Sequence, residues 1–302
     1  FDLPDEYKTE SRVLQAGVPN FLKAGIVYSS RVTTVSPTYA REIMTPYFGE
    51  GLDGTLSDQS WKVVGILNGI DVDLYNPASD PEITAAYTAK AWMRGKAACK
   101  RALQEELGLP KAAKNPLFAM VTRLDRQKGM DLLFHVLDEL LEEEIQFIVL
   151  GTGDPSYEKK LQDVESRHPG RMRAVIAYDR HLSRRIYAGA DLFVMPSLFE
   201  PCGLSQMIAM RYGTLPIVRQ TGGLADTVEA FNQDEKTGNG FGFLNINAHE
   251  LLFTAKEAIR IYLEDKEGWR RMVRTAMDGD YSWSRSAKTY EMLYQDIQEE
   301  AR

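Results

Sequence analysis

The chain has 302 residues, a formal net charge of −7 at pH 7 and 44% hydrophobic residues, a length that suits about two domains at roughly 150 residues each. Only 26% of the residues are charged and the sequence pI is about 5.3, so there is no basic field to bind nucleic acid or an anionic membrane. No apolar run reaches the roughly 20 residues of a membrane-spanning helix, and no signal-peptide layout is visible. We therefore expect a cytoplasmic protein, or a stromal one in a plant plastid, that binds neither nucleic acid nor membrane.

Cysteine and histidine positions give no sign of a disulfide framework or a metal site. Cys99 and Cys202 are the two cysteines, and they are far apart in the sequence. The four histidines do not show the H-x-x-x-H spacing that binds zinc on a helix. The sequence therefore predicts no structural disulfide and no local zinc site.

The first 75 residues are predicted to be the remnant of a first domain. We expect a helix over 20–28, a strand over 31–36, a helix opened by Pro37 over 37–46 and a second strand over 62–69. Two strands are too few for a stable parallel sheet covered on both faces. Because the chain also opens at Phe1 without a methionine, we expect residues 1–75 to be part of a larger Rossmann-like domain that is mostly absent.

A connection and a helix then lead into a second domain, which we place at 76–282. Residues 68–81 are rich in Asp, Asn and Pro and predict the connection. The next predicted helix covers 91–107. Residues 283–302 follow the second domain as a predicted amphipathic helix, which we expect to pack back toward the first domain.

Between residues 117 and 221, short apolar runs alternate with amphipathic stretches. The runs lack period-two alternation, which is typical of strands buried on both faces. We expect strands at 117–122, 146–151, 172–178, 191–197 and 215–220, with helices at 130–143, 155–167, 181–189 and 204–212. The pattern predicts an α/β fold with a complete, doubly wound, Rossmann-like parallel sheet.

Ligands of such sheets bind at the carboxyl ends of the strands, so the loops after the strands are the candidate sites. Arg123, Lys128 and Gly129 follow the first of these strands. Two fixed cations beside a glycine suit a phosphate group. Ordinary solvated surface charge explains this loop equally well when it is taken alone.

A second candidate loop, Thr221-Gly222-Gly223-Leu224, opens a predicted helix. Free N–H groups at a helix start bind anions, although a tight turn that needs glycine gives the same sequence. On the same sheet edge as Arg123 and Lys128, the turn favours a diphosphate ligand. Gly151 and Gly153 form a third small-residue loop, which matches neither a dinucleotide fingerprint nor a Walker A motif.

A third candidate loop carries Glu200 and Cys202. A carboxylate there is placed to bind sugar hydroxyls or a positive centre, or it is simply an acid favoured by a helix start. Cys202 taken alone is a small buried apolar residue. Tyr178 ends another strand, where it either stacks on a ligand ring or packs at the rim of the core.

Six segments together closely resemble bacterial glycogen synthases and plant starch synthases: VSPTYAREI (35–43), ILNGID (66–71), VTRLDRQKG (121–129), GTGD (151–154), the run from Ile186 to Arg219 that contains FEPCGL, and TGGLADTV (221–228). The resemblance implies a GT-B fold, in which two Rossmann-like domains face a cleft. It also implies transfer of glucose from ADP-glucose to the non-reducing end of an α-1,4-glucan with retention, without a metal or other cofactor. The lysine loop and histidine of the family's front half are not found in this chain.

The resemblance assigns roles to individual residues. Arg123 and Lys128 match the cations that bind the diphosphate, and Glu200 matches the acid that contacts the donor glucose. The position of a second acid in related enzymes is Ile208 here, so the corresponding ribose contact is not expected. The remaining matches are Asn68 near the acceptor, Tyr178 against the adenine, Gly151 and Gly153 in the small-residue loop, Cys202, Gly203 and Leu204 around the sugar, and Thr221, Gly222, Gly223 and Leu224 at the phosphates.

The residue types favour a mechanism in which Glu200 acts electrostatically and is not a nucleophile. Two cations stabilise the departing nucleoside diphosphate. The resemblance implies that retention follows from attack on the same face as the leaving phosphate. A covalent route with two carboxylates, as in retaining glycosidases, has a single candidate acid here.

Three alternatives stay open at this level. The first is another retaining GT-B enzyme that uses a different nucleotide sugar. The second is that the chain by itself is an inactive nucleotide-binding half. The third is a plain Rossmann domain with structural charges. The sequence does not decide between ADP and UDP.

Overall fold

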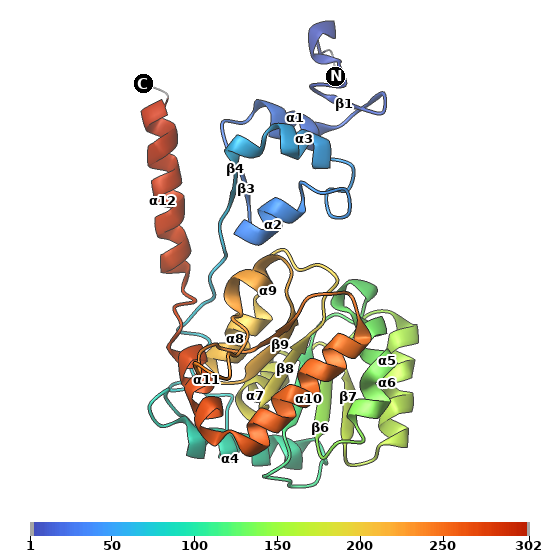
Figure 1. Ribbon diagram of the computed structural model, residues 1–302, viewed down its shortest axis with the longest axis vertical. Helices are drawn as coiled ribbons and strands as arrows, with labels where there is room; N and C mark the ends of the chain where they lie inside the picture. Colours follow the sequence, from blue (N-terminus) through green and yellow to red (C-terminus); the bar gives the residue numbers. More distant parts are fainter. Residues whose placement is uncertain (1–2, 301–302) are drawn as a thin grey trace.

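The larger part of the molecule is built on a six-stranded parallel sheet. The computed structural model describes residues 3–300, and Figure 1 shows this sheet in the lower part of the molecule. Its order is β10-β9-β8-β5-β6-β7, and every neighbouring pair is parallel. The strands are β5 (Leu117–Val121), β6 (Gln146–Gly151), β7 (Met172–Ile176), β8 (Leu192–Met195), β9 (Leu215–Arg219) and β10 (Phe241–Phe243).

The strand order reverses between β5 and β8, which lie side by side. From β5 the chain continues through β6 to β7, and it then crosses back to β8 and continues outward to β10. Doubly wound sheets bind their ligands at this switch point, outside the carboxyl ends of the two strands. The loops that follow β5 and β8 are therefore the first place to look for a site.

The sequence prediction of a doubly wound sheet is confirmed. β6 and β9 are buried along their whole length, as continuous apolar strands require. The predicted strands 172–178 and 191–197 each extend beyond the observed pairing, because β7 ends at Ile176 and β8 at Met195. The edge strand β10 was not predicted, since three residues carry too little periodicity.

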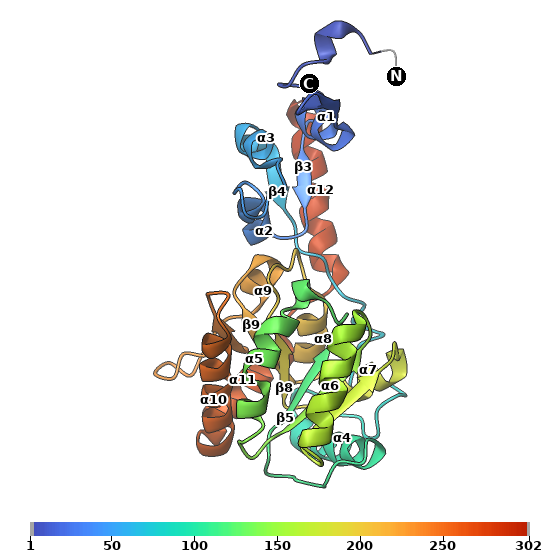
Figure 2. The ribbon, with the colours of Figure 1, turned by 90° about the vertical axis from the view of Figure 1, so that its right-hand side faces the viewer.

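Helices flank the sheet on both sides (Figures 1 and 2). α5 packs against α10, α4 against α7, and α8 against α11. Several begin at an aspartate or asparagine that accepts backbone N–H groups of the first turn, such as Asp154, Asp179 and Asn247. Among the residues that the structure describes, no helix is both long and apolar enough to span a membrane. The helices of this larger part of the molecule are α4 (Trp92–Glu106), α5 (Met130–Leu140), α6 (Pro155–Arg167), α7 (Arg180–Gly189), α8 (Ser205–Arg211), α9 (Gly222–Thr227), α10 (Ala248–Glu264) and α11 (Lys266–Asp278).

The N-terminal part is small and has its own minor core of Ile26, Leu52 and Leu56. Its β3 and β4 form a two-stranded parallel pair. The predicted strand over 62–69 is wrong outside 63–65, because Lys62 ends a 3-10 helix and donates to the carbonyls of Val27 and Ser29. The elements are β1 (Leu14–Gln15), β2 (Val18–Pro19), α1 (Phe21–Tyr28), β3 (Val32–Thr34), α2 (Pro37–Glu42), α3 (Asp53–Asp58) and β4 (Val63–Gly65).

The last helix, α12 (Trp283–Glu300), runs beside β3 and β4 in both views (Figures 1 and 2). Ser286 Oγ donates to the carbonyl of Leu67 at 2.6 Å, and Arg31 forms an ion pair with Glu300. These contacts join the end of the chain to the N-terminal part, far from it in sequence.

Candidate functional site

Lys128 and Glu200 form a bonded pair at the switch point of the sheet. Lys128 follows β5 and Glu200 follows β8, and Lys128 Nζ lies 2.7 Å from Glu200 Oε2. The exposed fractions of the two side chains are 16% and 9%. Ser197 Oγ donates to the same Glu200 oxygen at 3.0 Å. A lysine and a carboxylate that are held together, mostly out of water, interact more strongly than a surface pair.

Local structure places Lys128. Residues Arg126–Lys128 form a 3-10 helix, and Asp125 accepts the backbone N–H of Lys128 at 3.0 Å. Asp125 also forms an ion pair with Arg123 at 3.0 Å. The Arg123 side chain is 68% exposed, so its guanidinium is available to a ligand.

Arg219 fixes the loop that carries Glu200, and the sequence reasoning missed it. This buried guanidinium donates to the carbonyls of Ser197 at 2.8 Å and of Leu198. Burial lowers the pKa of Arg219 below its usual value. The signal in the sequence was a charged residue that ends an otherwise apolar strand.

Two adjoining cavities meet beside this pair. The larger, of about 540 Å³, has Arg123, Gly151 and Tyr178 in its lining, and the Tyr178 side chain stands at 84% exposure on its rim. The smaller, of about 120 Å³, is lined by Lys128, Ser197, Glu200 and Gly203 among others. The two share the walls Val121, Thr122, Leu204 and Ser205. The two cavities are therefore neighbours, on the two sides of these four residues.

Gly153 is held by contacts within its own loop. A Cβ at Gly153 would lie 2.3 Å from the carbonyl oxygen of Leu124, so the β5 and β6 loops meet only if this residue is glycine. Its N–H already donates to Glu158 at 2.9 Å. Both glycines have a packing role, since a Cβ at Gly151 would lie 2.0 Å from the carbonyl oxygen of Thr122, and Gly151 in addition lines the larger cavity.

The turn Thr221–Gly223 packs directly against the Glu200 loop. Gly223 donates to the carbonyl of Glu200 at 3.0 Å, and a Cβ there would lie 2.0 Å from the carbonyl oxygen of Cys202. Leu224 is fully buried beneath the turn. Gly222, where a Cβ would lie 2.1 Å from the carbonyl oxygen of Glu200, and Gly223 therefore pack against the backbone around Glu200.

Glu42 of the N-terminal part occupies the open end of that turn. Its Oε1 accepts from Thr221 Oγ1 at 2.8 Å and from the Gly222 N–H at 3.0 Å. The sequence reasoning expected this N–H to face a phosphate and missed Glu42, which lies about 180 residues away in the chain.

A second acid joins the same two helices. Asp226 on α9 accepts from Thr38 Oγ1 at 2.6 Å and from the Thr38 N–H at 3.0 Å on α2, and it also accepts from Ser36 Oγ. Figure 1 shows α2 standing directly above α9. The motifs at 35–43 and 221–228 thus meet in space at the boundary between the two parts.

Cys202 and Asn68 lie together at that boundary. Burial raises the pKa of the Cys202 thiol, and a hydrogen bond with the Asn68 backbone opposes that rise. Asn68 comes from the segment that connects the two parts and is half-buried. A buried, protonated thiol of this kind is not a nucleophile.

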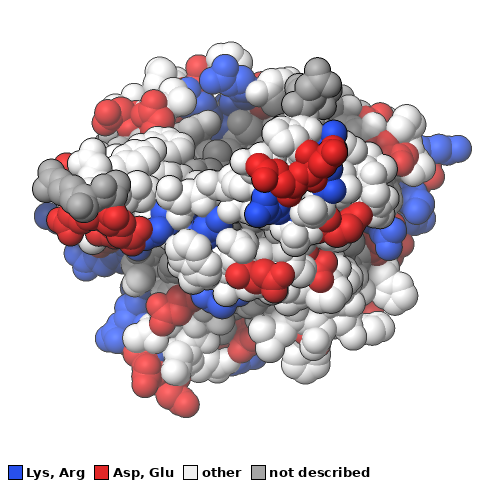
Figure 3. All heavy atoms as spheres, turned by 90° about the horizontal axis from the view of Figure 1, so that it is seen from above, with Lys and Arg blue, Asp and Glu red and all other residues white. Residues whose placement is uncertain are grey.

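Acidic and basic side chains are interspersed over the end of the molecule that carries the N-terminal part and α12 (Figure 3). No large field of one sign covers that face.

Comparisons with known proteins identify the family. Residues 104–277, more than half of the chain, match the family described as glycosyl transferases group 1. Residues 1–58 match a second family, described as starch synthase catalytic domain. The chain belongs to the group 1 glycosyl transferases. Together, the two matches confirm the predicted resemblance to the glycogen and starch synthases.

Individual relatives are similar along nearly the whole chain. The glycogen synthase of Bacillus cereus (strain ATCC 10987 / NRS 248) is 47% identical over 298 residues, which are 99% of this chain and 62% of the relative. That of Geobacillus thermodenitrificans is 48% identical over 98% of this chain and 61% of the relative. The chain thus spans about 62% of the length of the curated relatives it matches.

Solved structures confirm the predicted GT-B fold. The catalytic domain of starch synthase IV from Arabidopsis thaliana, bound to ADP and acarbose, is similar with a TM-score of 0.89 and 40% identity, over 98% of this chain and 62% of that one. A sucrose-phosphate synthase from Thermosynechococcus elongatus shares the fold at 21% identity, with a TM-score of 0.60 over 97% of this chain and 65% of that one.

Proposed function

We propose that this chain is the donor-binding part of a glycogen or starch synthase. The reaction is transfer of glucose from ADP-glucose to the non-reducing end of an α-1,4-glucan with retention. The observation that carries the proposal is the Lys128–Glu200 pair in the wall of the smaller of two neighbouring cavities at the switch point of the sheet. The glycogen synthase relatives and the starch synthase bound to ADP and acarbose support this choice of donor and acceptor.

The two cavities suit the two halves of the donor. The adenosine fits the larger cavity, with Tyr178 at the rim against the base and Arg123 toward the diphosphate. The glucose fits the smaller cavity, where Glu200 and the backbone around Gly203 reach its hydroxyls. Lys128 lines the smaller cavity beside Glu200, where its ammonium faces the phosphate that leaves the glucose.

Charge development explains the residue types. Cleavage of the glucosyl–phosphate bond leaves positive charge at the anomeric carbon and negative charge on the departing ADP. Lys128 and Arg123 stabilise the second charge, and Glu200 stabilises the first. Because Glu200 Oε2 is already bonded to Lys128 and Ser197, we assign the acid an electrostatic role. The acceptor hydroxyl attacks the face that the phosphate leaves, and no metal or other cofactor enters the proposal.

Donor binding and the boundary contact compete for one group. The Gly222 N–H serves a phosphate oxygen only after Glu42 has left it. Because both groups are negative, a diphosphate at the Gly222 N–H and the Glu42 carboxylate repel each other. Movement of α2 away from α9 is therefore coupled to occupation of the donor cavities.

The organisation that we propose follows the sequence reasoning. Residues 1–75 belong to the acceptor-side domain, 76–282 form the nucleotide-sugar domain, and 283–302 return to the first domain. Asn68 then lies on the acceptor side of the cleft. We place the enzyme in the cytoplasm, or in the stroma of a plastid.

Transfer to a glucan tests the proposal. Incubation of the chain with ADP-glucose and maltoheptaose should release ADP and add α-1,4-linked glucose. Release of UDP from UDP-glucose at an equal or greater rate would contradict the proposed donor. A glucosyl adduct on Glu200, found by mass spectrometry, would contradict the proposed role of this acid. Binding of ADP-glucose without transfer would show an inactive donor-binding half.

A further inference from the structure

A second cavity lies at the opposite end of the sheet. It has a volume of about 190 Å³ and is bounded by α4, α11 and the end of α10. Asp191, which lies in its wall, immediately precedes β8. The cavity is therefore at the amino ends of the strands, whereas the donor cavities are at their carboxyl ends.

The lining of this cavity carries four cations and one acid. Lys96 and Lys100 come from α4, Lys266 and Arg270 from α11, and Asp191 is the single carboxylate. Lys100 is paired with Asp191 at 2.6 Å. The other three cations have no matching acid in the wall, so the cavity holds a surplus of positive charge.

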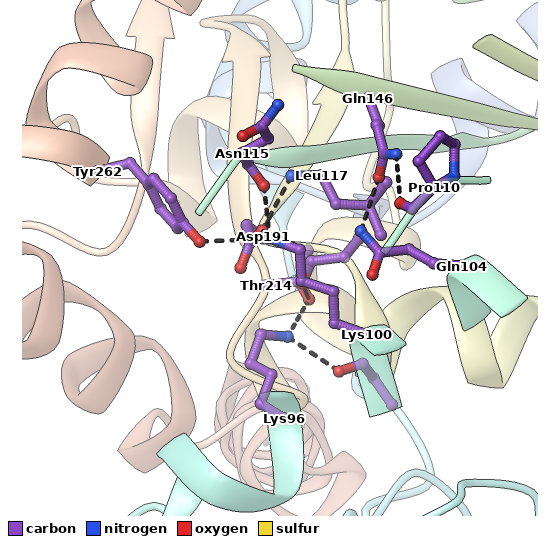
Figure 4. Close-up of polar contacts among 12 residues, drawn as sticks. Lys96, Lys100, Gln104, Pro110, Asn115, Leu117, Gln146, Asp191, Thr214 and Tyr262 are labelled. Atoms are coloured by element: carbon purple, nitrogen blue, oxygen red, sulfur yellow. Dashed lines mark hydrogen bonds and ion pairs between the residues drawn. The ribbon is translucent and has the colours of Figure 1, made fainter. Parts of the chain in front are cut away.

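The Lys96 ammonium is buried, and its partners are dipoles without net charge. It donates to the carbonyls of Ala188 and Tyr212 at 3.2 and 3.1 Å. It also donates to Thr214 Oγ1 at 2.6 Å, a contact that Figure 4 shows. Carbonyls at the ends of α7 and α8 satisfy its hydrogen bonds. Burial disfavours the charged form of Lys96 and lowers its pKa, while the Asp191 carboxylate in the same wall favours that form.

The basic residues of α11 fall into two groups, those with an ion-pair partner and those without one. Arg271 and Arg274 each pair with an acid four residues away on the same helix, Glu267 and Asp278. Lys266 and Arg270 are also four residues apart, yet no carboxylate within residues 3–300 forms an ion pair with either. Like charges at this spacing destabilise a helix unless something binds between them. The two unpaired cations are the ones that line the cavity.

The rest of the lining is apolar or aromatic. Trp92, Trp269 and Tyr262 line the cavity, and the Lys266 ammonium lies 4.7 Å from the centre of the Tyr262 ring. Flat apolar walls bind a small planar or apolar body by contact. The volume limits that body to about the size of one ring.

We propose that this cavity binds a small organic phosphate, with its charged group between Lys266 and Arg270 and its ring against Trp92. The site is independent of the proposed glucosyl transfer, because it shares no residue with the donor cavities. Occupation neutralises the surplus charge beside Lys96 and ties α4 to α11.

Tryptophan fluorescence of the full chain reports on this site, because Trp92 and Trp269 are two of its four tryptophans. Phenyl phosphate, inorganic phosphate and chloride at matched ionic strength are the probes. We expect saturable binding of phenyl phosphate, at least tenfold tighter than that of inorganic phosphate, and no saturable response to chloride. An equal response to all three would overturn the proposal.

Matched variants separate this site from the donor site. K266Q/R270Q should weaken phenyl phosphate binding at least tenfold. R271Q/R274Q, which removes the same charge from the same helix, should leave it unchanged, and so should K128A in the donor site. Unchanged binding in K266Q/R270Q, or loss of binding in K128A, would overturn the proposal. A normal circular dichroism spectrum and unfolding midpoint exclude misfolding as the cause of any loss.

Discussion

Two buried lysine–carboxylate pairs lie at opposite ends of the same sheet, and they have different surroundings. Lys128–Glu200 joins at 2.7 Å and Lys100–Asp191 at 2.6 Å, with similar burial. Lys100 also donates to the carbonyl of Asn115 and to Tyr262, and Asp191 also accepts the N–H of Leu117. Each pair lines a cavity, but Lys128 Nζ, by contrast, donates to Glu200 alone among the described residues.

This difference indicates that Lys100–Asp191 is a structural pair, whereas Lys128–Glu200 is a chemical pair, one that can contact a ligand. A buried pair whose hydrogen bonds are complete stabilises the fold and has no capacity left for a ligand. A lysine with hydrogen-bonding capacity left, such as Lys128, can turn to a substrate group. The N···O distances of the two pairs are nearly equal. The surroundings of each pair therefore determine whether it is structural or can bind a ligand.

Breaking the structural pair should have the largest effect on stability. Asp191→Ala leaves the Lys100 ammonium buried without its acid, and we expect the free energy of unfolding to fall by about 3–5 kcal/mol. Urea denaturation measures it. Asp138→Ala is the control, because the Asp138–Arg167 pair is half exposed and should contribute no more than about 1 kcal/mol. Equal losses in the two variants would contradict the comparison.

Changing the chemical pair should affect ligand selectivity. Glu200→Gln keeps the shape of the side chain and removes the charge that faces the glucose. We expect ADP-glucose to bind about 10- to 100-fold more weakly, the loss of one hydrogen bond to a charged group, while ADP affinity stays the same. Calorimetry of both ligands measures the ratio, with exposed Glu229→Gln as control. A parallel loss of ADP and ADP-glucose affinity would speak against a glucose contact.

The buried Lys96 should make stability depend on pH. Burial lowers the pKa of Lys96 from 10.5 to about 7. Between these values the unfolded chain binds more protons than the folded one, so stability contributed at this residue rises with pH by at most about 1.4 kcal/mol per pH unit. The difference in unfolding free energy between the parent and Lys96→Met, measured from pH 7 to 10, should show this rise. A flat difference would show that Lys96 keeps its usual pKa.

The smallest effect is expected at the boundary between the two parts. Glu42→Gln removes the negative charge from the Gly222 N–H. A charge beside such a group contributes about 0.3–1 kcal/mol, so ADP affinity should rise by up to about fivefold. Thr38→Val, which disturbs the neighbouring contact with Asp226, serves as control. Weaker ADP binding in Glu42→Gln would contradict the competition.

The sequence was sufficient where the signal is local. Continuous apolar runs predicted the sheet, and because β5 and β8 are neighbours, Lys128 and Glu200 followed from the rule on carboxyl ends. Arg219, Glu42 and Asp226 were missed, because their roles depend on partners that folding brings together from as far as 190 residues away. The basic cavity was missed for the same reason, since α4 and α11 lie far apart in the chain.

The most direct test of the central claim is calorimetric titration of ADP, with UDP as comparator, into the chain and its Lys128→Ala variant. The account predicts saturable binding selective for ADP, which is lost in Lys128→Ala and kept in the exposed control Lys159→Ala. Unchanged ADP affinity in Lys128→Ala, or binding of neither nucleotide to the parent chain, would contradict a donor site at the Lys128–Glu200 pair.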